Sequence, residues 1–312
     1  MTKKNNRIFN PDNTIVYTLS IGQTEGLNEQ PFINKSNFKK VCLTDDYSLK
    51  SSDWEIVNIN RILPQDQYRS QRNLKIRPHL IFPEYQYSFY FDNTIVLKKT
   101  PEDFIKEIFS RFNFKEDDPF FILPRHSFRD TLIDEFHECF AQRLDTDVRF
   151  FDQIYDYLLT NIELLYQKPF ATGILLRNHM NKKLINFSEI WFSHIVKYTR
   201  RDQLSILHSA EQAKFKLNGF DFDMHSSDFH KYPVVKNERL FRSTADNLYE
   251  LPSDFFDKIV QKIYSNNINN QLIFKKIKEE AYQHKLSMQK FSLSIQKLRL
   301  SMEKLSEENS LL

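Results

Sequence analysis

The stretch Y-S-F-Y-F-D-N-T-I-V-L, residues 87–97, decides the fold expected for this chain. Aromatic, apolar and β-branched residues fill it almost without interruption, which is typical of a strand buried on both faces of a sheet. Asp92 is the exception, because an ionised carboxylate inside such a strand costs several kcal/mol unless it is paired. We therefore expect the strand to end before Asp92, with Asp92-Asn93-Thr94 forming a turn.

The position of Asp92 also suggests a ligand site. In open α/β sheets, ligands bind outside the carboxyl ends of the strands. A lone carboxylate at such an edge suits a divalent cation that holds phosphate groups. The alternative is that Asp92 only caps a turn.

The rest of the chain up to about residue 220 alternates between strand and helix patterns. Strands are expected at 14–21, 40–44, 54–59, 119–124 and 174–177, and helices at 66–80, 101–112, 128–142, 148–166 and 187–197, with a further helix or turn from 200. Such alternation predicts an α/β fold with a mostly parallel sheet flanked by helices. We expect residues 1–13 to be loose, residues 14–250 to form this domain, and residues 251–312 to form a helical tail.

The composition excludes several function classes. Four glycines in 312 residues are too few for a dinucleotide-binding loop or a Walker loop. The net charge of +3 gives no reason to expect a nucleic-acid partner. Cys42 and Cys139 show no metal-ligand spacing, and no apolar run is long enough for a signal peptide or a membrane span. The expected location is cytoplasmic.

The tail contains three consecutive seven-residue repeats, LSMQKFS, LSIQKLR and LSMEKLS, over residues 286–306. Their apolar residues predict a coiled coil, and we expect the chain to form a homo-oligomer through residues 271–312. A second apolar line favours a bundle or docking on the domain. Three lysines recur with the same period, so the alternative is peripheral membrane association, which would place the protein at the inner face of the membrane.

The ordered motifs of residues 14–235 resemble the glycosyltransferase-like domain family found in plant cell-wall and mucilage proteins and in bacterial polysaccharide loci. The resemblance rests on V-Y-T-L-S-I-G at 16–22, V-C-L-T-D-D at 41–46, W-E-I at 54–56, R-S-Q-R-N-L-K-I-R-P-H at 69–79, Y-S-F-Y-F-D-N at 87–93, R-H-S-F-R at 125–129, I-L-L-R-N-H at 174–179 and R-R-D-Q-L-S at 200–205. The ordered set is specific, although no single motif decides it.

This resemblance implies a GT-A-like fold in which an acidic turn holds a divalent metal, Mn²⁺ or Mg²⁺, on the diphosphate of a nucleotide-sugar. Asp92 matches that acidic position, but a second acid is missing beside it. A histidine late in the domain serves as a metal ligand in some such enzymes, and His225 is the candidate here.

The candidate site residues fall into three groups. Nucleotide-sugar binding is expected from Thr18, Thr44, Asp45, Arg72, Lys75, Asp92 and Asn93. The acceptor or sugar is expected to contact Arg125, His126, Glu135 and Arg201, while Asp202 and Gln203 form the catalytic centre. Asp202 is expected to act as a general base or to bind sugar hydroxyls. The structural alternatives are turn residues, a solvated helix face and a helix N-cap.

The sequence thus predicts a metal-assisted glycosyltransferase that moves a sugar from a nucleotide-diphosphate donor to a glycan or polysaccharide acceptor. The alternative is a non-catalytic protein of the same fold that assembles through its C-terminal helix. A sugar-phosphate transferase is a third, weaker reading, since it would use the same cations and carboxylates.

Overall fold

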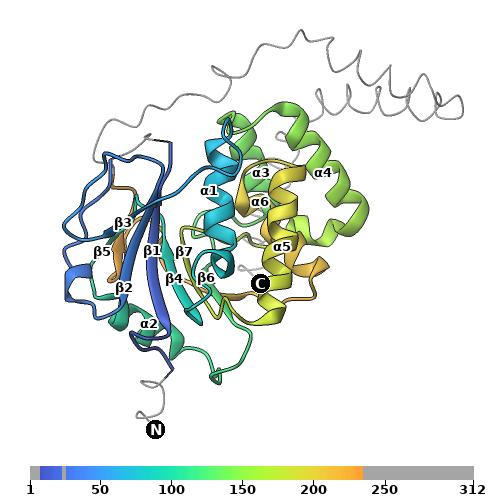
Figure 1. The fold of residues 1–312 in the computed structure, drawn as a ribbon. Helices are drawn as coiled ribbons and strands as arrows, with labels where there is room; N and C mark the ends of the chain where they lie inside the picture. The colour runs from blue at the N-terminus through green and yellow to red at the C-terminus, as the bar shows by residue number, and fades with distance from the viewer. Residues whose placement is uncertain (1–7, 23–25, 235–312) are drawn as a thin grey trace, which may run out of the picture. The chain divides into compact units, whose positions relative to one another are not determined.

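The computed structural model describes residues 8–22 and 26–234, and these residues belong to one compact unit (Figure 1). The predicted tail and its heptads lie outside the described residues. No helix within the described part is long and apolar enough to cross a membrane.

A seven-stranded sheet forms the centre of the unit, in the order β3-β2-β1-β4-β7-β6-β8. Its strands are β1 (Thr14–Ser20), β2 (Lys39–Thr44), β3 (Glu55–Asn58), β4 (Tyr87–Phe91), β6 (Phe121–Pro124), β7 (Ile174–Arg177) and β8 (Asn218–Phe220). All pairings are parallel except those of β7, which runs antiparallel to β4 and β6. The predicted mostly parallel α/β sheet is confirmed, and the reversal of β7 was not predicted.

The alternation of side chains along the strands separates the two faces of the sheet. One face buries Phe89 and Phe91 of β4 in an apolar cluster with Phe104 and Ile108 of α2 (Pro101–Phe109). Strand β5 (Val96–Leu97) follows the turn after β4 and pairs antiparallel with β9 (His230–Lys231) in a separate two-stranded sheet.

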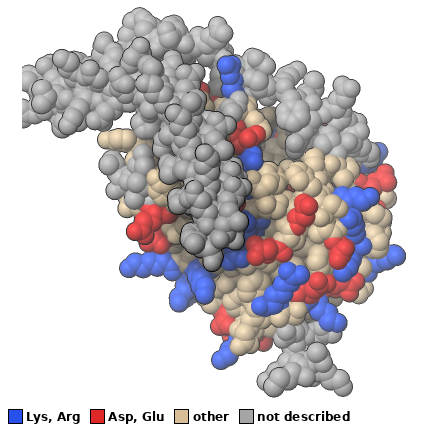
Figure 2. Space-filling model, turned by 180° about the vertical axis from the view of Figure 1, so that it is seen from behind, with Lys and Arg blue, Asp and Glu red and all other residues tan. Residues whose placement is uncertain are grey.

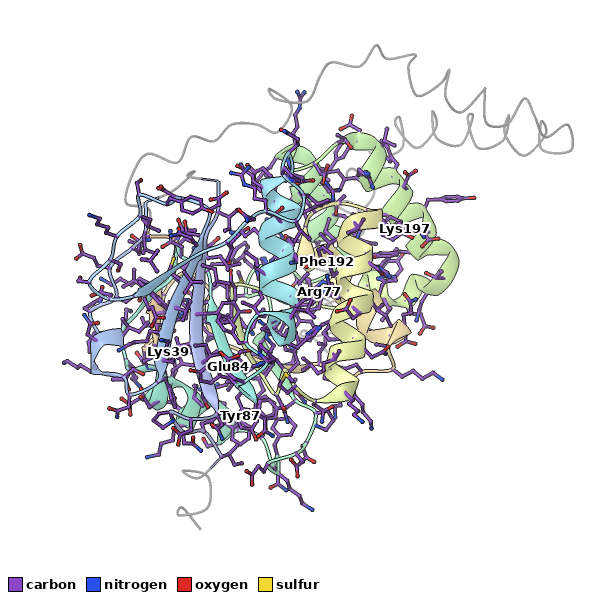
Figure 3. All side chains as sticks on the ribbon, viewed as in Figure 1. Lys39, Arg77, Glu84, Tyr87, Phe192 and Lys197 are labelled. Carbon is purple, nitrogen blue, oxygen red and sulfur yellow. The ribbon has the colours of Figure 1, made fainter. Side chains whose placement is uncertain are left out.

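The opposite face of the sheet is covered by α1 (Gln67–Ile76) and α5 (Lys182–Lys197), with α3 (Leu132–Ala141), α4 (Asp147–Asn161) and α6 (Asp202–Gln212) beyond them (Figure 1). Arg77, just after α1, places its guanidinium 5.1 Å from the ring centre of Phe192 on α5 (Figure 3). Arg69 of α1 donates to the carbonyls of Ile195 and Tyr198 at the end of α5. These contacts fix α1 against α5, which matters because α1 forms one wall of the pocket described below.

Several element boundaries differ from the prediction for identifiable reasons. The third helix begins at Leu132 and not near 128, because Thr131 caps it in a reciprocal capping box with Asp134. Helix α5 begins at Lys182 and not at 187, with Asn181 as its N-cap. Helix α4 ends at Asn161, and a 3₁₀ helix covers Ile162–Tyr166.

Residues 8–13, which were expected to be loose, pack against the sheet. The ring of Phe9 lies edge-on to Tyr87 and Phe109 at 4.9 Å between centroids. The backbone carbonyl of Asn13 accepts hydrogen bonds from the amides of Gln86 and Tyr87. The apolar pair Ile8 and Phe9 anchors this segment. It was missed because the residues directly on either side of the pair are polar.

The visible part of the face opposite to the view of Figure 1 carries acidic and basic side chains side by side (Figure 2). This mixed surface agrees with the small net charge of the chain. The described residues on this visible face form no large patch of one charge sign.

Candidate functional site

A cavity of about 370 Å³ opens at the carboxyl ends of β1, β4 and β6. One wall is a face of α1, with Gln67, Gln71 and Lys75 spaced four residues apart. The residues at the start of α6 form another wall, and residues of the segment 222–232 complete the lining. The volume falls in the range of small-molecule sites, and the position is where α/β sheets bind ligands.

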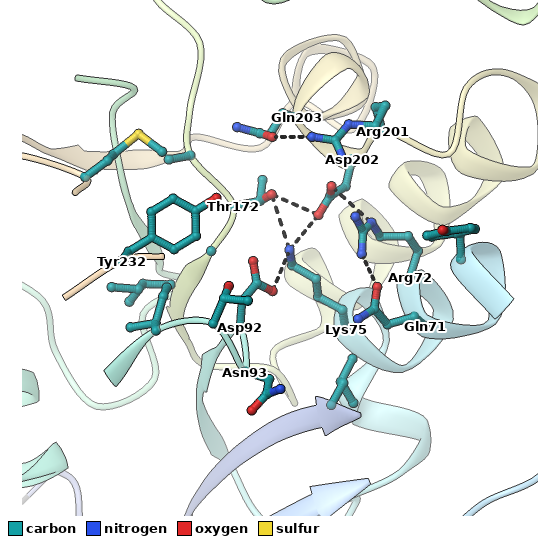
Figure 4. A pocket seen from close by; sticks show the side chains of 18 of the residues that line it. Gln71, Arg72, Lys75, Asp92, Asn93, Thr172, Arg201, Asp202, Gln203 and Tyr232 are labelled. Carbon is teal, nitrogen blue, oxygen red and sulfur yellow. Dashed lines mark hydrogen bonds and ion pairs between the residues drawn. The ribbon is translucent and has the colours of Figure 1, made fainter. Parts of the chain in front are cut away.

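Asp202 is the centre of a buried network of charges in this cavity (Figure 4). Its Oδ1 lies 3.1 Å from Nε of Arg72, and its Oδ2 lies 2.7 Å from Nζ of Lys75. The hydroxyl of Thr172 also donates to Oδ2 at 2.8 Å. Trp191 of α5 donates from its indole nitrogen to the Asp202 carbonyl at 3.1 Å, which fixes the first turn of α6.

Charged neighbours hold the Asp202 carboxyl in its ionised form. Burial by itself raises the pKa of this carboxyl. The cations Arg72, Lys75 and Arg201 lower the pKa by more than burial raises it, so the pKa lies well below its ordinary value. A carboxylate with so low a pKa is a poor proton acceptor near neutral pH. The geometry therefore favours Asp202 as the residue that holds the cations in place, and argues against the general-base role.

Asp92 is the second carboxylate of the cavity, and about a third of its side chain is exposed. Its Oδ1 accepts a hydrogen bond from the hydroxyl of Tyr90 at 2.5 Å and lies 3.4 Å from Nζ of Lys75. Its backbone forms the predicted turn: the amide donates to Gly173 and the carbonyl accepts from Ile95, both at 2.9 Å. Strand β4 ends at Phe91, as the sequence predicted.

Arg201 is the N-cap residue of α6 and lines the cavity. Its Nη2 donates to the side-chain oxygen of Gln203 at 3.3 Å (Figure 4). Burial lowers the pKa of its guanidinium, but Cys139, Asp202 and Glu135 raise it more, so the net pKa is above the ordinary value. The side chains that line the cavity include four cations, at 72, 75, 200 and 201, and two carboxylates. Arg200 also lies 3.9 Å from the buried carboxylate of Asp145, and the lining still has a surplus of positive charge.

Residues 32–237 match the model of the TOD1/MUCI70 glycosyltransferase-like domain. The chain belongs to this family. Among curated proteins it is 23% identical over 209 residues to the "Probable hexosyltransferase MUCI70" of Arabidopsis thaliana, which is 63% of this chain and 35% of that protein. The chain therefore spans about a third of the length of that relative.

Solved structures that resemble the fold are also glycosyltransferases by their titles. The bifunctional glycosyltransferase WbbM aligns with a TM-score of 0.40 at 9% identity, over 68% of this chain and 40% of that one. Mouse xyloside xylosyltransferase 1 aligns with a TM-score of 0.38 at 10% identity, over 67% of this chain and 84% of that one. The family assignment itself rests on the sequence match.

Seven of the predicted site residues line the cavity: Arg72, Lys75, Asp92, Asn93, Arg201, Asp202 and Gln203. Asn93 is largely engaged elsewhere, because its side-chain oxygen accepts from the amide of Asn28 and its nitrogen donates to the carbonyl of Gly26. Its role is to fix the loop that begins near Gly26.

Three residues predicted to bind the nucleotide do not line the cavity. Thr18 is buried in the sheet and donates to the carbonyl of Phe91 at 2.9 Å. Thr44 is also buried, and its hydroxyl accepts from the amide of Asp46. Asp45 accepts from the amide of Gly22 and pairs with Arg61. They sit at strand ends as expected, but their side chains are used to hold neighbouring backbone.

Most of the residues predicted for the acceptor do not line the cavity. His126 and Glu135 are buried, 3.6 Å apart, and Glu135 also lies 3.5 Å from Arg129. Arg125 is partly exposed and donates to the carbonyl of Gly219. Only Arg201 of this group reaches the cavity.

The cavity also contains functional candidates that the sequence analysis missed. Tyr90 does not line the cavity but supports it from beneath, through its hydrogen bond to Asp92, and it could have been found, since it is two residues before Asp92 and therefore on the same face of the strand. Thr172 gave no signal: it precedes β7, and only the reversal of β7 brings that end of the strand to the carboxyl edge of its neighbours. Arg200 and Tyr232 also line the cavity.

The described residues do not fit a divalent metal ion. None of them form a group of three or more His, Cys, Asp and Glu side chains placed to hold one. His225 stacks on Phe128 and does not line the cavity, so the structure does not bring it together with Asp92. Both cavity carboxylates already face Lys75. An ion between these carboxylates would have to share them with the buried ammonium group of Lys75.

Proposed function

We propose that this domain is a glycosyltransferase that moves a sugar, in the first place a hexose, from a nucleoside-diphosphate donor to a glycan or polysaccharide acceptor. The observation that carries the proposal is the cationic cavity at the carboxyl edge of the sheet, in a chain of this family. A surplus of positive charge suits a diphosphate, whose negative charge grows when the sugar leaves.

The donor's diphosphate would lie against Arg72, Lys75 and Arg201. Arginine forms paired hydrogen bonds with phosphate oxygens, and lysine supplies a point charge. The ion pairs with Asp202 hold the Arg72 and Lys75 side chains ready before the donor binds. Such preorganised charge stabilises the leaving group without reorganisation during the reaction.

The transfer itself breaks the bond between the anomeric carbon and the diphosphate and forms a bond from that carbon to an acceptor hydroxyl oxygen. The hydroxyl proton must pass to a base. Asp92 is the better placed carboxylate for this, because it is partly exposed in the cavity, whereas both oxygens of Asp202 are engaged by cations. The Gln203 side chain at the start of α6 lines the cavity, which supports a role in binding sugar hydroxyls.

The acceptor would approach from the side of Tyr232, whose ring lies across the cavity from Arg72 (Figure 4). This placement replaces His126 and Glu135 as the acceptor contacts, because both are buried and neither lines the cavity. Arg125 stays a proposal for the outer part of an acceptor site.

Calorimetric titration with UDP, GDP, ADP and CDP tests the donor site. We expect one of them to bind the native protein, and Arg72→Met to weaken that binding by about tenfold or more, as loss of a charged hydrogen bond implies. Arg111→Met is the matched control, because Arg111 is an exposed arginine paired with Glu107 and does not line the cavity. The preferred nucleotide then selects the donor sugars for a turnover assay.

Absence of binding by every nucleotide, with the protein folded, would contradict the transferase proposal. That result would favour the alternative, a non-catalytic protein that assembles through residues 271–312. Cytoplasmic location, homo-oligomerisation and membrane association stay predictions from the sequence.

A further inference from the structure

Lys75 is surrounded as a bound cation would be. Its Nζ lies 2.7 Å from Asp202 Oδ2, 3.3 Å from Thr172 Oγ1 and 3.4 Å from Asp92 Oδ1. Only about 2% of its side chain is exposed, and the ring of Tyr90 lies beneath it at 5.3 Å. Three oxygens from three separate segments thus converge on one buried ammonium group (Figure 4).

The backbone of α1 is held so that Lys75 stays in this position. The buried guanidinium of Arg177 on β7 donates to the Lys75 carbonyl at 2.7 Å. The same guanidinium donates to the hydroxyl of Tyr17, which in turn donates to that carbonyl at 3.1 Å. A flexible lysine at a helix surface would need no such support.

Two other side chains at the cavity that could serve as metal ligands, Asn93 and His230, are already bonded to protein partners. Asn93 is bonded to the loop at Gly26 and Asn28. Both ring nitrogens of His230 have partners, the Met224 carbonyl at 2.8 Å and the Ser227 hydroxyl at 2.7 Å. The pair Asp92 and Asp202 is therefore the remaining acidic site, and Lys75 lies in it.

We propose that Lys75 occupies the cation position between Asp92 and Asp202, so that the donor site binds a nucleoside diphosphate without a divalent metal. This inference rests on the proposed function for the identity of the ligand, whereas the occupancy of the cation position by Lys75 does not. With Lys75 and Arg72 facing the two carboxylates, Arg201 is the further cation of the lining that would meet the phosphates.

The decisive variant is Lys75→Met, which removes the ammonium group but keeps an unbranched apolar side chain. It leaves two carboxylates facing one another, and such a pair attracts Mn²⁺. Electron paramagnetic resonance of free Mn²⁺, without nucleotide, measures the result. We expect no binding by the native protein or by the control Lys75→Arg, and binding of Mn²⁺ by Lys75→Met. Tryptophan fluorescence checks that each variant is folded.

The native protein provides a second measurement that needs no variant. The affinity for the preferred nucleoside diphosphate is measured by calorimetry in EDTA and again with Mn²⁺. We expect the two dissociation constants to agree within about twofold, and Lys75→Met to bind about tenfold more weakly in EDTA and to recover part of this loss with Mn²⁺.

Three results would overturn the inference: nucleotide binding by the native protein that is lost in EDTA, Mn²⁺ binding by the native protein that Asp92→Asn removes, or a folded Lys75→Met that binds no Mn²⁺. If no nucleotide binds under either condition, the proposed function fails, and the Mn²⁺ titrations still decide whether Lys75 fills the cation position.

Discussion

Replacing Asp202 by Asn tests the central network most directly. The substitution keeps the shape of the side chain but removes its charge. It leaves Arg72 and Lys75, whose side chains are 12% and 2% exposed, without the carboxylate that lies 3.1 Å and 2.7 Å from them. Breaking a buried ion pair by neutralising one partner costs about 3–5 kcal/mol, because the remaining charge is left uncompensated.

The assay is urea unfolding followed by tryptophan fluorescence. Trp54 and Trp191 are the only tryptophans of the sequence, and both lie in the described domain, so the signal reports on this domain. We expect a loss of about 3–5 kcal/mol, which for a domain of this size lowers the melting temperature by about 6–20 °C.

The control is Asp221→Asn. Asp221 also faces an arginine, Arg125 at 3.5 Å, but its side chain is 75% exposed. An exposed pair of this kind contributes about 0–1 kcal/mol. If Asp202→Asn destabilises the domain no more than Asp221→Asn does, the assignment of a buried, tightly coupled network is wrong.

The pH dependence of the same comparison has a defined sign. The pKa of Asp202 is lowered in the folded state, so its contribution to stability is fully present above the unfolded pKa of about 3.9 and is lost as the pH falls through the folded value. The stability difference between native protein and Asp202→Asn should be constant from about pH 8 to 5 and shrink below about pH 4. A difference that disappears near pH 6 would contradict the lowered pKa.

Three further predictions follow from single contacts. Gly22 has a φ of +87°, and a Cβ there would lie 2.2 Å from the side-chain oxygen of Gln67. Gly22→Ala should therefore lower the free energy of unfolding by at least about 1–2 kcal/mol in urea titrations, and an unchanged unfolding midpoint would contradict this. Burial lowers the pKa of His179 to about 3, so the histidine stays neutral when folded and contributes about 2 kcal/mol to the fall in stability from pH 7 to pH 5. His179→Asn should lose that part of the fall, while the part due to other buried histidines such as His126 remains, and an unchanged pH dependence would contradict the assignment. Tyr90→Phe removes the hydrogen bond to Asp92 and should cost about 1–3 kcal/mol of stability, whereas a neutral effect would show that the bond is not formed in solution.

Local sequence signals gave most of the elements because they depend on neighbours along the chain. The run of apolar residues at 87–91 is a strand buried along its whole length, and the turn begins at Asp92. The spacing of Arg72 and Lys75 on one helix placed both side chains in the cavity. Helix starts were missed where the capping residue, such as Thr131 or Asn181, stood outside the apolar pattern.

The partners of the charged residues were not available from such signals. The rule that ligands bind at carboxyl strand ends placed Thr18, Thr44 and Asp45 at the right edge of the sheet, but it does not say toward which neighbour a side chain turns. Their hydrogen bonds go to backbone at Phe91, Asp46 and Gly22.

The sequence by itself determined the α/β class, the acidic turn at Asp92, the cationic face of α1 and the family, since each depends on residue order or on a period of two or four residues. Only the tertiary structure decided that β7 runs in reverse, that Thr172 thereby joins the site, and that Lys75 lies between Asp92 and Asp202. Strand direction and ion-pair choice depend on how segments far apart in the sequence pack together, and no local pattern encodes that packing.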